Sequence, residues 1–74
     1  MLGTTVYVHE VYGWRPFRGP KFITRRRAEK WALELVEELA QGGRESAVAV
    51  WDWLTREVVF ETRCRRVADA PGVN

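Results

Sequence analysis

Residues 24–43, TRRRAEKWALELVEELAQGG, are the stretch of sequence that decides the fold. Their apolar residues recur at helical spacing and form one stripe, whereas most of the acidic residues fall on the opposite side. Thr24 belongs to a residue type that caps helix N-termini, and Gly42 and Gly43 can supply the left-handed conformation that ends a helix. The sequence therefore predicts an amphipathic helix over residues 25–41, which has to bury its apolar stripe against another element.

Segments rich in β-branched and aromatic residues lie on both sides of this helix. Residues 4–12 predict a strand before it, and residues 46–53 and 57–64 predict two strands after it, joined by a turn. Residues 13–20 have the glycines and prolines of a turn, and residues 21–23 predict a short additional strand. The order of elements predicts an α+β fold, a two-layer β(β)αββ arrangement in which one helix packs on one face of an antiparallel sheet of three to four strands.

The chain has 74 residues, which suits one small domain. We expect residues 1–66 to form that domain and residues 67–74 to be a flexible C-terminal tail. An apolar content of 46% argues against disorder, and the sequence shows neither the roughly 20-residue apolar run of a membrane span nor a signal peptide. Its one cysteine, Cys64, cannot form an internal disulfide and is typical of a reducing compartment, so we expect a cytoplasmic protein with no membrane partner.

Residues that carry most enzymatic chemistry are few and scattered in this sequence. It has one histidine, His9, and one serine, Ser46, and no spacing matches a metal site or a phosphate-binding loop. His9 has no identifiable nucleophile or orienting partner, and Cys64 alternates with Val58 and Phe60 as a small buried residue does. We therefore expect no enzyme, no catalytic residue, no cofactor, no metal and no small-molecule substrate.

A formal net charge of +2 conceals an uneven distribution of charge along the chain. Residues 1–27 carry six bases and one acid, whereas residues 28–61 carry three bases and eight acids. Such an asymmetry predicts a basic end on the folded molecule. That basic end could meet an anionic partner or, alternatively, the acidic flank of another copy of the chain.

Two basic segments are candidates for contacting the phosphates of DNA or RNA. Residues 14–21 interleave aromatic and basic residues, as nucleic-acid-binding surfaces do. Residues 25–27 place three arginines in the first helical turn, where the helix dipole disfavours cations, and a bound anion would compensate for them. The alternative is that these arginines pair with Glu29 or with acids in residues 57–61. The candidate nucleic-acid-binding residues are Trp14, Arg15, Phe17, Arg18, Lys21, Arg25, Arg26, Arg27, Arg63, Arg65 and Arg66.

The strands predict a second possible function, a protein-interaction module. Residues 46–53 are apolar on both faces, and one helix can cover only one of them. The aromatic face would then bind a second copy of the chain or another protein, as in a small dimeric regulator or inhibitor encoded by a mobile element. Alternatively, these aromatic residues form the core, and Val48 and Val50 face outward. The candidate interface residues are Tyr7, Leu33, Trp51 and Trp53.

Residues 22–31, FITRRRAEKW, are similar to the strand–cap–helix passage of arm-type DNA-binding domains in phage integrases. The shared features are an anchoring aromatic residue, a threonine cap, and alanine and tryptophan on the inner face of the helix. That family places three strands before its helix, whereas two strands follow the helix here. The resemblance therefore implies neither a fold nor a site for this chain.

Overall fold

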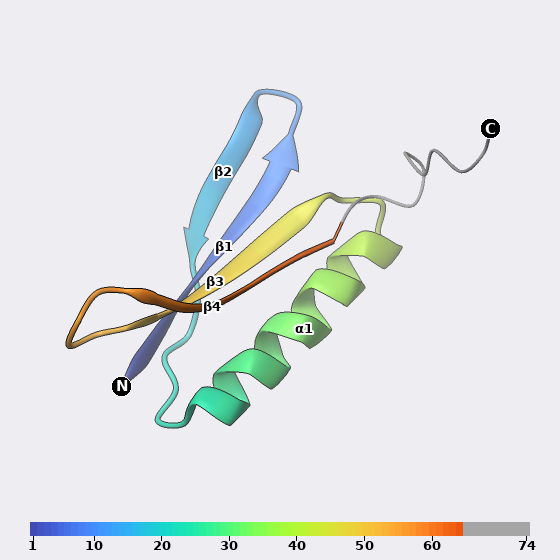
Figure 1. Cartoon of the computed structure of the whole chain (residues 1–74). Coiled ribbons are helices and arrows are strands. Elements are labelled where there is room, and N and C mark those ends of the chain that lie inside the picture. The colour runs from blue at the N-terminus through green and yellow to red at the C-terminus, as the bar shows by residue number, and fades with distance from the viewer. Residues whose placement is uncertain (65–74) are drawn as a thin grey trace.

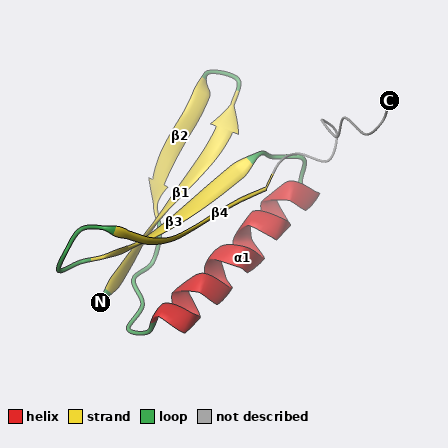
Figure 2. Cartoon of the chain, viewed as in Figure 1, coloured by secondary structure: helices red, strands yellow, loops and turns green. Residues whose placement is uncertain are grey.

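A computed structural model describes residues 1–64 of the chain as a four-stranded antiparallel sheet with one helix on one of its faces (Figures 1 and 2). The strands are ordered β2-β1-β3-β4 across the sheet. This arrangement confirms the two-layer α+β prediction. The elements are β1 (Leu2–Glu10), β2 (Gly13–Arg18), α1 (Arg25–Gln41), β3 (Ser46–Asp52) and β4 (Val58–Cys64).

The core lies between α1 and one face of the sheet. The buried residues of α1 recur at every fourth position from Ala28 to Ala40 and rest mainly on β3 and β4. Val48 and Val50 of β3 are completely buried under them. The helix thus covers the valine face of β3, and the aromatic face is the one that it leaves uncovered.

The ends of α1 follow from residues next to them in sequence. Thr24 has extended backbone, and its side-chain oxygen accepts a hydrogen bond from the Arg27 backbone N–H at 3.4 Å. At the other end, Gly43 has φ +81°, the left-handed conformation in which glycine is favoured. The predicted bounds of the helix and its threonine cap are confirmed.

Residues 13–20, predicted to be a turn, form β2 over most of their length, which corrects that prediction. The turn between β1 and β2 is Val11 and Tyr12, and Gly13 follows with φ +108°. Pro16 is tolerated because β2 is the edge strand of the sheet and needs fewer backbone hydrogen bonds. Pairing with β1 has therefore overridden a local turn preference.

The short strand predicted over residues 21–23 is also wrong. Only Phe22 pairs, in an isolated bridge with Leu2 of β1. This bridge continues the path of β2 along β1 and leads the chain to the start of α1. The predicted tail, residues 67–74, lies outside the described residues.

One irregularity in β4 changes which side chains share a face. The register between β3 and β4 shifts, so that Val50 lies opposite Phe60 but Trp51 lies opposite Val58. The extra residue, Val59, packs against the core. Val58 was predicted to share the face of Phe60. Instead it shares the face of Trp51 and is 59% exposed, because the bulge reverses the alternation at this point.

Candidate functional site

The sheet face opposite α1 is covered by none of the described elements, and we call it the open face (Figure 1). Residues directly opposite each other in antiparallel strands point to the same face, so the pairing registers identify its members. The open face consists of Gly3, Thr5, Tyr7 and His9 of β1, Trp14, Pro16 and Arg18 of β2, Ala47, Ala49 and Trp51 of β3, and Val58, Glu61 and Arg63 of β4.

Aromatic rings stand at both ends of the open face. At one end Trp51 stacks on Trp53, with ring centroids 6.3 Å apart and planes inclined by 8°. At the other end the ring of Trp14 meets that of His9 edge to face, with centroids 5.2 Å apart. Tyr7, Trp14 and Trp53 are 36%, 40% and 45% exposed, so the protein leaves aromatic ring surface available to a partner.

Cations lie among these rings. The Lys21 ammonium is 3.8 Å from the ring centroid of Trp53, and the Arg63 guanidinium carbon is 5.0 Å from that of Trp14. Arg18 points to the same face from β2. Within residues 1–64 none of these three cations forms an ion pair with a carboxylate. Their charges are therefore not neutralised by carboxylates within residues 1–64, and Lys21 and Arg63 each lie over a ring that a bound base would share with them.

A small cavity of about 230 Å³ opens at the Trp51 end of the open face. Trp51 lies directly over Gly3, since a Cβ atom at Gly3 would be only 2.5–2.9 Å from three atoms of the indole. The indole N–H donates to the Thr5 hydroxyl at 3.4 Å, which holds the ring against the sheet. The cavity is lined by Gly3, Thr4, Arg18, Gly19, Lys21, Trp51 and Trp53.

The structure separates the basic and aromatic residues predicted to form one binding surface. Trp14, Arg18, Lys21 and Arg63 belong to the open face or its edge. Arg15 and Phe17 point to the other face of β2, as their pairing with buried residues of β1 shows. The Arg15 guanidinium lies 3.6 Å from the Glu10 carboxylate. Arg65 and Arg66 lie outside the described residues.

The three arginines at the start of α1 lie on the helix side of the sheet. Arg25 forms an ion pair with Glu29 and donates to the Val59 carbonyl oxygen at 2.8 Å, so it ties the helix to β4. This agrees with the alternative of intramolecular pairing for that residue. Arg26 and Arg27 are exposed. The helix N-terminus and the open face are thus separate surfaces.

The predicted protein-interface residues are separated in the same way. Tyr7 and Trp51 lie on the open face and Trp53 stacks on Trp51, whereas Leu33, 49% exposed, lies on α1. Gly3 was not identified from the sequence as the residue on which the Trp51 ring rests. A glycine beside β-branched residues indicates that another group approaches the strand backbone closely, but it does not show that this group is Trp51.

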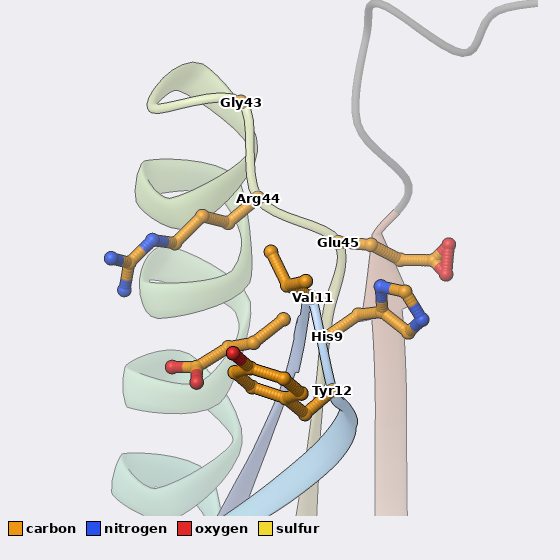
Figure 3. A pocket seen from close by; sticks show the side chains of 7 residues that line it. His9, Val11, Tyr12, Gly43, Arg44 and Glu45 are labelled. Atoms are coloured by element: carbon orange, nitrogen blue, oxygen red, sulfur yellow. The ribbon is translucent and has the colours of Figure 1, made fainter.

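A second cavity, of about 580 Å³, lies between the β1–β2 turn and the segment that follows α1 (Figure 3). His9 and Glu45 point to one side of it, and Arg44 and Tyr12 point to the other (Figure 3). Because its polar groups do not converge on one point, this cavity offers no defined ligand position. The smaller cavity, with two cations at a pair of indoles, is the better candidate.

Other chemistry is sparse among the described residues. Residues 1–64 contain no group of three side chains that could hold a metal ion and no helix long and apolar enough to cross a membrane. Comparisons with protein-family models, curated proteins and solved structures gave no match. The open face therefore has to be interpreted from its own geometry and charge.

Proposed function

We propose that this protein binds nucleic acid through the open face, with phosphates on its cations and bases on its exposed rings. The observation that carries the proposal is the alternation of Arg18, Lys21 and Arg63 with Trp14 and Trp53 on one surface. Cations neutralise phosphates and supply affinity without sequence preference. Aromatic rings add stacking, which is open to any base because every base has a π face.

The charge on the two sides of the molecule supports this choice of surface. The outer side of α1 exposes Glu34, Glu37 and Glu38. Glu61 is the one carboxylate among the open-face residues named above, and Arg18 and Arg63 lie on the same face. The four bases and four acids of α1 balance each other, whereas the open face and its edge carry more cations than carboxylates. A polyanion is therefore attracted more strongly to the open face.

The salt dependence of binding tests this proposal. Contact with three phosphates gives a log–log slope of affinity against salt of about −2 for a single strand and about −3 for a duplex. The double variant Arg18→Ala/Arg63→Ala removes two of these contacts, so it should flatten the slope by about 1.4–1.8. Fluorescence anisotropy of a labelled oligonucleotide between about 50 and 200 mM salt measures the slope.

The control is the double variant Arg26→Ala/Arg27→Ala, which removes the same charge from the helix side. Its slope should match that of the parent protein. No binding to DNA or RNA at low salt refutes the proposal. A larger effect of the control than of the open-face variant places the contact on the helix N-terminus and refutes the role of the open face.

A second candidate function is favoured by one observation, the exposure of Tyr7, Trp53 and Val58 on the open face. Exposed apolar side chains of this kind are typical of protein interfaces. Face-to-face contact of two copies would bring their cations together with few carboxylates to neutralise them, which ranks a homodimer second. Sedimentation at tens of micromolar distinguishes the two, because a dimer that Trp53→Ala dissociates supports the protein interface.

A further inference from the structure

We infer that the bound nucleic acid is an unpaired single strand that runs along β1, with one base seated in the cavity beside Trp51 and Trp53. This inference rests on the proposed function and adds to it the class of nucleic acid, the path of that nucleic acid along β1 and the length of the site. It follows from three features: the position of the exposed rings, the size of the cavity and the distance between the two aromatic ends of the open face.

Exposed rings on an uncovered sheet face select unpaired bases. In a duplex each base is stacked between its neighbours, so its faces cannot meet a protein ring. A duplex would instead need an element that enters a groove, such as a basic two-stranded ribbon. The β1–β2 ribbon is unsuited to that, because its turn is Val11 and Tyr12, 93% and 92% exposed, and nearby Arg15 is paired with Glu10.

The cavity has the size and lining for one base. At about 230 Å³ it is smaller than the roughly 300–1,000 Å³ pockets that hold drug-sized ligands, so it suits a single ring system. The indoles of Trp51 and Trp53 line the cavity and can stack on a base. Because Gly3 has no side chain, the Trp51 ring can lie close to the backbone of the sheet. Arg18 and Lys21 stand at the same cavity, where they can hold the phosphates flanking that base.

The distance along β1 sets the length of the site. At one end of the open face Trp51 lies over Gly3, and at the other end His9 contacts Trp14. Gly3 and His9 are six residues apart on β1. At about 3.3 Å per residue, this distance is about 20 Å. Stacked nucleotides rise about 3.4 Å each along one strand, and nucleotides whose bases lie on protein rings are more extended, so at most about six nucleotides connect the two ends. Arg63 lies over Trp14 and would hold a phosphate at the far end.

The first test uses the unaltered protein and needs no variant to fold. Labelled oligothymidylates and oligouridylates of about 3, 6 and 12 nucleotides are compared with a duplex at one salt concentration. Affinity should rise steeply to about six nucleotides and then level off, and the duplex should bind at least about tenfold more weakly. The two oligomer series show whether the strand is DNA or RNA. A trimer as tight as a hexamer, or a duplex as tight as a single strand, overturns the inference.

The second test removes the ring at each end of the open face. Trp53→Ala and Trp14→Ala should each weaken hexamer binding by about 5- to 100-fold, the cost of losing one stacked base. Both residues are partly exposed and lie outside the core cluster, so the fold should survive their truncation. Tyr12→Ala is the matched control, since it removes an exposed aromatic ring from the β1–β2 turn, away from the open face.

The outcomes separate the inference from the proposed function. Equal binding of duplex and single strand, both weakened by Arg18→Ala/Arg63→Ala, overturns the inference but leaves nucleic-acid binding on the open face intact. Absence of binding to every oligonucleotide refutes both. Equal effects of Tyr12→Ala and Trp53→Ala on hexamer binding overturn the placement of a base at the cavity.

Discussion

Replacing Gly3 by alanine should displace Trp51 from the sheet. The added Cβ would lie 2.5–2.9 Å from three indole atoms, whereas ordinary contacts are 3.4–4 Å, so the ring has to retreat by roughly 1 Å. Overpacking a core costs about 1–3 kcal/mol. Because the ring can tilt toward solvent on the open face, we expect the lower part of that range, about 1–2 kcal/mol.

Thermal unfolding measures this cost. A loss of about 1–2 kcal/mol corresponds to a decrease in Tm of about 5–15 °C for a domain of this size. Far-UV circular dichroism follows the unfolding, and the near-UV spectrum reports the stacked pair of Trp51 and Trp53. The near-UV signal should decrease in the variant at temperatures where the far-UV spectrum is still native.

Gly42→Ala is the control for this substitution. Gly42 has φ −81°, and a Cβ there would meet only ordinary contacts, the closest at 3.5 Å. Alanine at such a position leaves stability unchanged or raises it by about 0.4–1 kcal/mol. If Gly3→Ala melts within about 2 °C of the parent and keeps its near-UV spectrum, Trp51 does not rest on Gly3, and the cavity described above is wrong.

Three further substitutions test the packing that supports the open face. Val48→Ala should cost roughly 2–3 kcal/mol in urea unfolding, because Val48 is completely buried under α1. Thr24→Ala should cost about 0.5–1 kcal/mol through loss of the helix cap, and Thr24→Ser should restore most of it. Ser46→Ala should be neutral or stabilising, since the buried Ser46 hydroxyl has no hydrogen-bond partner among the described residues. A loss above about 1 kcal/mol for Ser46→Ala would show that this hydroxyl is bonded.

Short-range features were predicted best. The helix over residues 25–41 was predicted correctly at both ends, because its cap and its apolar stripe depend on residues within a few positions of each other. The strand over residues 13–18 was predicted as a turn, because Gly13 and Pro16 are turn residues locally and only pairing with β1 makes them extended. Val58 was placed on the wrong face because one bulge reverses the alternation of β4.

The candidate site shows the same division. The sequence singled out the aromatic and basic side chains of residues 14–21 together with Trp51 and Trp53, and the structure places several of them on or beside the open face. It grouped the arginines of residues 25–27 with them, although the helix carries these to the other side of the sheet. Trp14 lies on β2 and Arg63 lies on β4. The two side chains meet only because the sheet places β1 and β3 between these strands and turns both side chains to the same face.

The sequence by itself determined the amphipathic helix, the strand-forming segments and the excess of cations and aromatic rings, since each depends on residue type and near-neighbour spacing. The tertiary structure alone decided that the valine face is buried, that Trp14 and Trp53 remain exposed, and that cations lie beside them. The physical reason is that strand register and helix docking are long-range choices. A one-residue shift in register moves every side chain of a strand to the opposite face.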